Sequence, residues 1–225
     1  MTTPGTGYPA GMSRIRAFPD RRVAGLHLGE RLAEREWHDP LVLGLARGGV
    51  VVAHAVAEVL RAPLDVAVAR KIGAPGHPEF GIGAVTASGE VTYDERTLAA
   101  LGLRPADLTA ACEAERAEAR RREEVYLGGR PPRPRAGRDV LLVDDGLATG
   151  VTARAAAHAV RAESPRSVSF AAPVCAPEAG TNLKADVDEV VCLLVPEEFR
   201  AVGQWYGNFD QTTDDEVVEL LGSRS

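Results

Sequence analysis

The sequence VLLVDDGLATGVT occupies residues 140–152 and joins an apolar strand to two adjacent carboxylates, Asp144 and Asp145. Small residues and two hydroxyls follow before an Ala-rich helix begins, so the pattern predicts a strand, a tight turn and a helix. Adjacent carboxylates repel each other unless donors or a cation occupy them, and ribose hydroxyls or a nearby Mg2+ would do so. A helix N-terminus favours a phosphate, which predicts a sugar-phosphate site that includes Ala148, Thr149, Gly150, Val151 and Thr152.

Short apolar runs alternate with helical patterns along the rest of the chain. Strands are predicted at 41–45, 64–69, 167–172 and 189–195, and helices at 21–35, 50–61, 107–127, 178–184 and 214–221. A Gly- and Pro-rich stretch at 70–81 predicts a long loop, and residues 82–86 and 90–93 predict a hairpin. This alternation is typical of an α/β fold with a central, mostly parallel sheet flanked by helices, in which ligands bind beyond the carboxyl ends of the strands.

Two further turns follow predicted strands and are expected to meet the acidic turn in one cleft. Arg47-Gly48-Gly49 offers exposed amides and a guanidinium, which match the oxygens of a pyrophosphate. Arg70 and Lys71 place two cations at the start of the predicted loop. Each of these signals alone is equally compatible with a structural turn. The chain contains neither GxxxxGK[ST] nor GxGxxG after a strand, which argues against a Walker P-loop and a dinucleotide fingerprint.

Composition and charge exclude several classes of function. The chain has 225 residues, of which 45% are hydrophobic and 26% charged, as in soluble globular proteins. A net charge of -6 gives no general attraction to nucleic acid, and no apolar run approaches the roughly 18 residues of a membrane helix. Residues 1–13 lack the features of a signal peptide. They are expected to form a disordered lead-in to a single domain at 14–225, located in the cytoplasm.

The cysteines and histidines predict neither a disulfide framework nor a metal site. The chain has three cysteines, an odd number that leaves at least one unpaired, and they form no CxxC motif: Cys112, Cys175 and Cys192. Cys175 and Cys192 lie in apolar runs, so we expect both to be small buried hydrophobic residues. The histidines are scattered without an HxxxH pair, which argues against a metal site built on them.

Together these motifs resemble those of the type I phosphoribosyltransferases (PRTases), which use 5-phosphoribosyl 1-pyrophosphate (PRPP). Residues 140–152 are similar to the PRPP-binding motif, Ala46-Arg47-Gly48-Gly49 to the pyrophosphate loop, and Arg70-Lys71 to the entrance of the flexible catalytic loop. Residues 41–83 and 202–206 are most similar to bacterial predicted phosphoribosyltransferases of undefined substrate. The resemblance begins near Phe18 and implies the type I PRTase-like fold, with a small C-terminal hood at about 196–210.

The resemblance also implies a role for each matched residue. Asp144 and Asp145 would bind the ribose hydroxyls of PRPP and contribute indirectly, with PRPP, to a Mg2+ site. Residues 148–152 would surround the 5-phosphate. Pyrophosphate would be bound by Arg47, Gly48, Gly49 and Lys71, with a cis peptide near Arg47-Gly48. The catalytic residues implied are Arg47, Arg70 and Lys71, which would meet the departing pyrophosphate.

The hood of these enzymes covers the accepting base. The aromatic residues Phe199, Trp205, Tyr206 and Phe209 gather in this segment, although the chain is only 5% aromatic. We expect Phe199 and Trp205 to stack on a base, and the alternative interpretation is that they pack the C-terminal segment onto the sheet. Ala148 stands where hypoxanthine-guanine members carry an acid, which argues against 6-oxopurines. Adenine and uracil members share the alanine.

The activity implied is that of an enzyme of nucleotide metabolism, a pentosyl-transferring glycosyltransferase. It would transfer the phosphoribosyl group of PRPP to a nitrogenous base or related nucleophile with Mg2+ and release pyrophosphate. Two alternatives stay open: a PRPP- or nucleotide-sensing regulator of the same fold, and a hydrolase in which water replaces the base. The partners implied are PRPP and a small-molecule base. Family members are often dimers, so a homodimer is also implied.

Overall fold

The computed structural model describes residues 18–223, and only the backbone of residues 78–80. The expected lead-in at 1–13 lies outside the described residues. In chain order the elements are α1 (Arg21–Leu32), β1 (Leu41–Leu45), α2 (Gly48–Leu60), β2 (Leu64–Ala67), β3 (Ala69–Ala74), β4 (His77–Thr86), β5 (Val91–Tyr93), α3 (Glu95–Leu101), η2 (Pro105–Leu108), α4 (Thr109–Leu127), β6 (Asp139–Val143), α5 (Val151–Arg161), β7 (Ser167–Val174), α6 (Pro177–Leu183), β8 (Glu189–Leu194), η3 (Val202–Trp205) and α7 (Asp214–Gly222).

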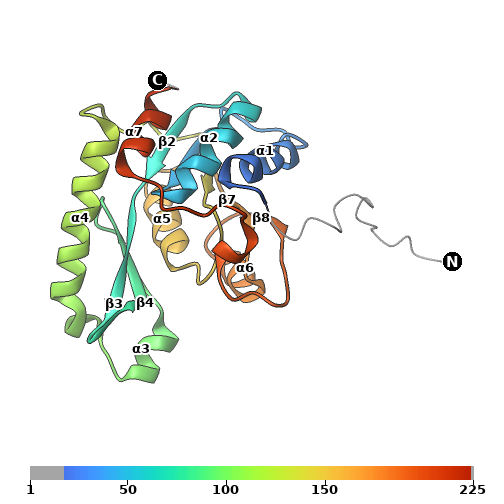
Figure 1. The fold of residues 1–225 in the computed structure, drawn as a ribbon. Helices are drawn as coiled ribbons and strands as arrows, with labels where there is room; N and C mark the ends of the chain where they lie inside the picture. The colour runs from blue at the N-terminus through green and yellow to red at the C-terminus, as the bar shows by residue number, and fades with distance from the viewer. Residues whose placement is uncertain (1–17, 224–225) are drawn as a thin grey trace.

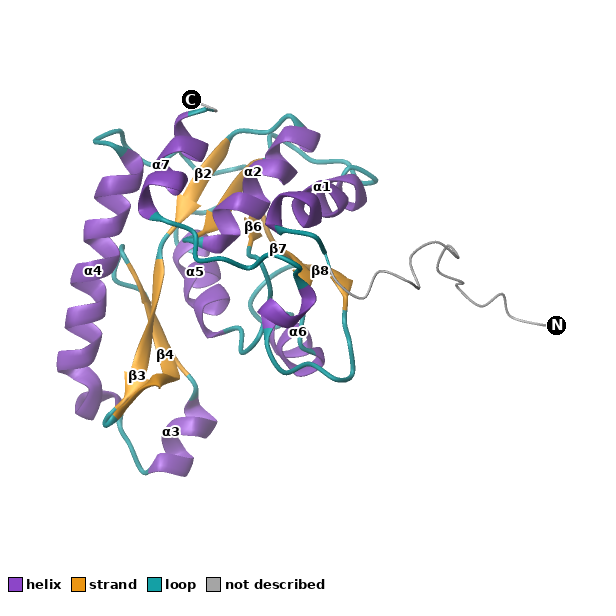
Figure 2. Ribbon diagram, in the orientation of Figure 1, coloured by secondary structure: helices purple, strands orange, loops and turns teal. Residues whose placement is uncertain are grey.

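The central sheet has five parallel strands in the order β2-β1-β6-β7-β8 (Figure 2). Leu41 of β1 lies opposite Val140 of β6. The chain proceeds from β1 to β2 on one side of this pair and from β6 to β7 and β8 on the other. The strand order therefore reverses between β1 and β6. The predicted α/β fold, a mostly parallel sheet flanked by helices, is confirmed.

Side chains that alternate along the strands supply a separate core on each face of the sheet. Val42 and Leu141 pack with α1, α2 and α7, whereas Leu43 and Leu142 pack with α5 and α6. All four side chains are fully buried, and each such burial contributes about 1.5–3 kcal/mol. Helices α1 and α2 lie side by side (Figure 1), and a Cβ at Gly25 of α1 would lie 2.6 Å from a carbonyl oxygen of α2. The sheet is thereby held rigidly between two helical layers.

Local signals define the ends of several helices. Asp20 caps α1 as predicted, because its side chain accepts the backbone N–H of Val23 at 2.8 Å. Thr213 and Glu216 form a capping box at the start of α7. Gly128 ends α4 in the left-handed region with φ 58°.

Within residues 18–223, no helix is both long enough and apolar enough to cross a membrane.

The long loop predicted at 70–81 is wrong, because these residues belong to an antiparallel hairpin of β3 and β4. The hairpin turns at Gly76, whose φ is 77°, so the Gly and Pro signal marks a tight turn between strands. The predicted hairpin between β4 and β5 is confirmed and completes a second, three-stranded sheet. Ile72 and Ile82 are fully buried and pack with Leu98 of α3. Figure 1 shows the hairpin beside α4, extending away from the central sheet.

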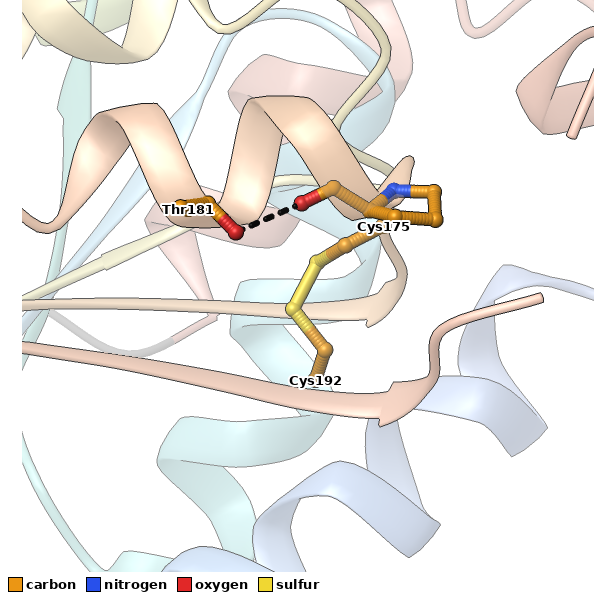
Figure 3. Close-up of a disulfide and its surroundings, with 4 residues drawn as sticks. Cys175, Thr181 and Cys192 are labelled. Carbon is orange, nitrogen blue, oxygen red and sulfur yellow. Dashed lines mark hydrogen bonds between the residues drawn. A yellow bond between two sulfur atoms is a disulfide. The ribbon is translucent and has the colours of Figure 1, made fainter. Parts of the chain in front are cut away.

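Cys175 and Cys192 form a disulfide, which corrects the expectation that neither is bonded (Figure 3). Cys175 follows β7 and Cys192 lies in the adjacent β8, with their Cα atoms 6.1 Å apart. The odd cysteine count was misleading because the third residue, Cys112, is a buried free thiol elsewhere. Beside the disulfide, the Thr181 hydroxyl donates to the Pro177 carbonyl of α6 at 3.0 Å. The bond therefore joins neighbouring strands next to the loop that leaves β7.

Candidate active site

The turns after β1 and β6 meet where the strand order reverses, which is the usual ligand position in open α/β sheets. Gly49, near the start of α2, lies directly against the end of β6. A Cβ at Gly49 would lie 2.7 Å from the carbonyl oxygen of Val143 and 2.9 Å from Cα of Asp144. Only glycine permits this approach, so the predicted pyrophosphate turn is held against the predicted ribose-binding carboxylates.

Asp144 and Asp145 are half-buried at the carboxyl end of β6. Asp144 Oδ1 accepts the backbone N–H of Asp145 at 2.8 Å. Burial raises the pKa of both carboxyls, and repulsion from Asp145 raises that of Asp144 further, whereas Lys71 lowers it. The Tyr206 hydroxyl donates to the Asp145 carbonyl at 2.5 Å, and burial raises the pKa of that phenol. The two carboxylates would therefore be stabilised by a ligand that brings hydrogen-bond donors or a cation.

Arg21, the first residue of α1, is the cationic partner of Asp145. The Arg21 Nε lies 2.8 Å from Asp145 Oδ2, and the two side chains are only 11% and 16% exposed. Arg21 Nη1 donates to the Asp210 carbonyl at 2.8 Å, and the guanidinium lies over the Phe209 ring at 3.8 Å from its centroid. The sequence carries no local signal for this contact, because Arg21 and Asp145 are 124 residues apart.

The residues predicted to surround a phosphate lie in the turn between β6 and α5 and at the start of α5. Ala148 and Thr149 are exposed, and Gly150 caps α5 with φ 79°. Helix α5 begins at Val151, and its first N–H groups have no partner within the helix. The Val151 side chain packs against β4 and α5, so this residue can offer only its backbone. Thr152 lines the cavity next to the turn.

The three predicted cations lie on two parts of the chain: Arg47 in the turn after β1, and Arg70 and Lys71 in β3. Arg47 follows a cis peptide at Ala46–Arg47, one bond earlier than the cis peptide expected near Arg47-Gly48. Arg47 Nη1 lies 3.6 Å from Asp214 of α7. Arg70 of β3 donates from Nε to Glu115 of α4 at 2.8 Å, and its neighbour Lys71 is exposed.

One cavity of about 820 Å³ brings most of the predicted residues together. A volume of this order is typical of small-molecule sites. The predicted residues that line the cavity are Arg47, Gly48, Arg70, Lys71, Asp144, Asp145, Ala148, Thr149, Gly150 and Thr152. Gly49 and Val151 are not among the lining residues. Four residues that were not predicted as site residues also line it: Glu115 and Arg122 of α4, and Val202 and Gln211 of the C-terminal segment.

The predicted stacking residues, Phe199 and Trp205, do not line this cavity. Both belong to a small apolar core with Tyr206, as the alternative interpretation of the hood expected. The reason is that packing the segment onto the sheet buries their apolar area. Phe209 does line the cavity, where its ring contacts Arg21 and stacks on Tyr206 with centroids 5.0 Å apart. Among the hood aromatics, Phe209 is therefore the one in position to meet a ligand.

The oxygen donors at the site suit a Mg2+ ion that arrives with a phosphate ligand. Within the described residues, no group of three or more His, Cys, Asp or Glu side chains could hold a metal ion. Mg2+ commonly keeps several waters and binds through one or two carboxylates together with substrate phosphates. Asp144 and Asp145 supply that number of carboxylates at the cavity wall. The residues present therefore fit an ion shared with the ligand.

A family model described as the phosphoribosyl transferase domain matches residues 22–205. The matched range contains the turns after β1 and β6 and the whole β3–β4 hairpin. It stops short of Phe209 and Gln211, which complete the cavity from the C-terminal segment.

Two similar proteins come from Mycobacterium tuberculosis, strains CDC 1551 / Oshkosh and ATCC 25618 / H37Rv, and are named "Putative phosphoribosyl transferase MT0597" and "Putative phosphoribosyl transferase Rv0571c". Each is 42% identical over 207 residues, which are 92% of this chain and 47% of the relative. The chain thus spans about half the length of the curated relatives it matches. The crystal structure of TT1426 from Thermus thermophilus is 46% identical, with a TM-score of 0.79 over 93% of this chain and 99% of that one.

Proposed function

We propose that this chain, which belongs to the phosphoribosyl transferase family, transfers the phosphoribosyl group of PRPP to a nitrogen nucleophile with Mg2+ and releases pyrophosphate. The observation that supports this most strongly is the single cavity shared by the carboxylate pair, the start of α5 and the cations Arg47, Arg70 and Lys71. Each of these groups complements a different part of PRPP. The carboxylates suit the ribose, the helix start suits the 5-phosphate, and the cations suit the pyrophosphate.

The ligand would be held mainly by the end of the central sheet. Ribose hydroxyls donate to Asp144 and Asp145, which replaces the lost hydration of these buried carboxylates. The amides of residues 148–152 and the dipole of α5 bind the 5-phosphate dianion. Gly48 brings the backbone close to the pyrophosphate. Arg70 exchanges its contact with Glu115 for a pyrophosphate oxygen.

The reaction exchanges one bond at C1 of the ribose for another. The bond from C1 to the pyrophosphate oxygen breaks, and its electron pair leaves with pyrophosphate. The nitrogen lone pair of the acceptor forms the new C1–N bond on the opposite face, and the proton of that nitrogen passes to solvent or a base. Arg47, Arg70 and Lys71 stabilise the negative charge on the leaving group. Asp144 and Asp145 would hold a Mg2+ ion together with PRPP, and such an ion would supply further neutralisation of this charge. Positioning of the reactants supplies much of the remaining acceleration.

The acceptor is proposed to be a nitrogenous base or a related nucleophile that enters beside the C-terminal segment. Val202, Phe209 and Gln211 line that part of the cavity. Phe209 is a better candidate for contact with a flat ring than Phe199 or Trp205, because those two are not lining residues. The alanine at position 148 argues against a 6-oxopurine as the acceptor.

Pyrophosphate release tests this proposal directly. The protein is incubated with PRPP and Mg2+, alone and with each member of a panel of purines, pyrimidines and small amines. Release that depends on one acceptor supports the transferase. Release without any acceptor would indicate a hydrolase, and PRPP binding without turnover would indicate a sensor of the same fold. No binding of PRPP would contradict the proposal in every form.

A further inference from the structure

Arg21 joins three parts of the chain at the edge of the cavity. It begins α1, yet its side chain is only 11% exposed. Its Nε donates to Asp145 Oδ2 and its Nη1 donates to the Asp210 carbonyl, each at 2.8 Å. The same guanidinium lies over the Phe209 ring. One side chain therefore connects a proposed ribose ligand to the segment beside which the acceptor would enter.

The turn after β1 is shaped around this contact. A Cβ at Gly48 would lie 2.8 Å from Arg21 Nε and would overlap Asp145 Oδ2. Any larger residue at this position would thus displace the Arg21–Asp145 pair. Because Gly48 has no side chain, the proposed pyrophosphate turn can lie directly against Arg21 and against Asp145, the proposed ribose ligand.

Asp145 is also held through its backbone from the C-terminal segment. The Tyr206 hydroxyl donates to the Asp145 carbonyl at 2.5 Å, and the Tyr206 ring stacks on Phe209. Arg21 contacts only Oδ2 of Asp145 in its ion pair, so Oδ1 is outside that pair. The contacts with Arg21 and Tyr206 therefore fix the orientation of Asp145, while Oδ1 lies outside the ion pair with Arg21.

We infer that Arg21 is a positioning residue for PRPP, which orients Asp145 toward the ribose and couples that carboxylate to the hood segment through Phe209 and Asp210. This inference rests on the proposed function, since its ligand is PRPP. Arg21 itself need not touch the reacting atoms. An arginine suits the role because its planar fork serves two acceptors and a ring at once, which a lysine ammonium cannot do.

The test compares Arg21→Gln with Arg22→Gln by calorimetric titration of the whole chain with PRPP in the presence of Mg2+. The two substitutions remove one positive charge from the same helical turn. Arg22 is a matched control because its side chain is 62% exposed and its nearest carboxylate, on Glu58, is 3.5 Å away. Arg21→Gln is expected to raise the Kd for PRPP about tenfold or more. Arg22→Gln is expected to change the Kd by less than about twofold.

The conservative variant and a check of folding separate positioning from a general structural role. Arg21→Lys keeps a positive charge beside Asp145 but cannot serve two acceptors and a ring at once. A positioning role predicts that Arg21→Gln raises the Kd for PRPP while its circular dichroism at the titration temperature matches that of the wild type. Arg21→Lys should give an intermediate Kd.

The outcomes distinguish the inference from the proposed function. Equal Kd values for Arg21→Gln and the wild type would overturn the inference and leave the proposed function standing. A raised Kd that comes with loss of folded structure, neither of which Arg21→Lys restores, would also overturn it, because that describes a structural residue. A wild-type protein that does not bind PRPP would overturn the proposed function, and the inference with it.

Discussion

The two walls of the cavity are built in different ways. The sheet wall consists of the turns after β1 and β6, which carry Gly48, Gly49 and the carboxylate pair. The hairpin wall consists of β3, which carries Arg70 and Lys71, and α4, which carries Glu115 and Arg122. The sheet wall continues from strands with a core on each face, whereas the hairpin wall has one small core of its own.

A glycine of the sheet wall and one at the tip of the β3–β4 hairpin show how the two regions differ in packing. A Cβ at Gly49 would lie within 2.9 Å of Asp144, whereas a Cβ at Gly76 would have no atom within 4 Å. Strands β3 and β4 also shift register on both sides of Gly73. The turns of the sheet wall are therefore sterically fixed, whereas the tip of the hairpin is open. The fixed wall suits the ribose and 5-phosphate, which stay bound through the proposed reaction. Both walls contribute to the proposed pyrophosphate site, through Arg47 and Gly48 on one side and Arg70 and Lys71 on the other.

The largest expected effect comes from breaking the sheet wall with Asp144→Asn and Asp145→Asn together. The double variant should weaken PRPP binding by about a hundredfold or more, because two charged acceptors are lost. The fold should survive, since neutral side chains remove the repulsion and the burial cost of the pair. Calorimetry with PRPP and circular dichroism measure the two quantities. Unchanged affinity in a folded double variant would refute the ribose-binding role.

A smaller effect is expected from Lys71→Met in the hairpin wall. This change removes a charge that would stabilise the leaving group, so kcat for pyrophosphate release should fall about tenfold to a hundredfold. The KM for PRPP should change less, because the sheet wall is intact. Lys184→Met is the matched control, since Lys184 is exposed at the end of α6. A larger change in KM than in kcat would contradict this division between the walls.

Alanine substitutions at two glycines compare the walls by stability. Gly48→Ala should cost about 1–3 kcal/mol of unfolding free energy and weaken PRPP binding, because the new methyl group meets Arg21 and Asp145. Gly76→Ala should cost about 1–2 kcal/mol, because its φ of 77° strains any other residue, and should leave PRPP binding unchanged. Denaturant unfolding and PRPP titration check both variants. Equal PRPP affinities of Gly48→Ala and Gly76→Ala would contradict the distinction between the sheet wall and the hairpin.

The smallest expected effect is on the pH dependence of stability. Burial and repulsion from Asp145 raise the pKa of Asp144 in the folded protein, so the folded state favours its protonated form. The stability from this proton is fully present below the unfolded pKa of about 4 and is lost as pH rises through the folded pKa. The thermal midpoint of Asp144→Asn should therefore exceed that of the wild type by about 2–4 °C near neutral pH, and by less in acid. A difference that grows in acid would contradict the raised pKa.

The sheet wall could be predicted from short patterns. The apolar run, the carboxylates and the start of α5 are continuous in residues 140–152, and the cavity includes both Asp144 and Asp145. The hairpin wall was only half predictable. The sequence predicts its cations, Arg70 and Lys71. The glycines between residues 70 and 81, however, are typical of a loop, although the segment forms two strands. Gly83 sits inside β4 because a Cβ there would lie 2.7 Å from the Tyr93 ring, a packing constraint that composition does not reveal.

The sequence by itself determined the α/β class, the two turns and the cation pair Arg70-Lys71 that meet at the cavity, because strand, turn and helix signals act over a few residues. Only the tertiary structure decided the Arg21–Asp145 ion pair, the Cys175–Cys192 disulfide and which hood aromatic lines the cavity. Each of these depends on which distant segments become neighbours when the strands take their order in the sheet. Arg21 and Asp145 are 124 residues apart along the chain, and no pattern local to either residue specifies the other.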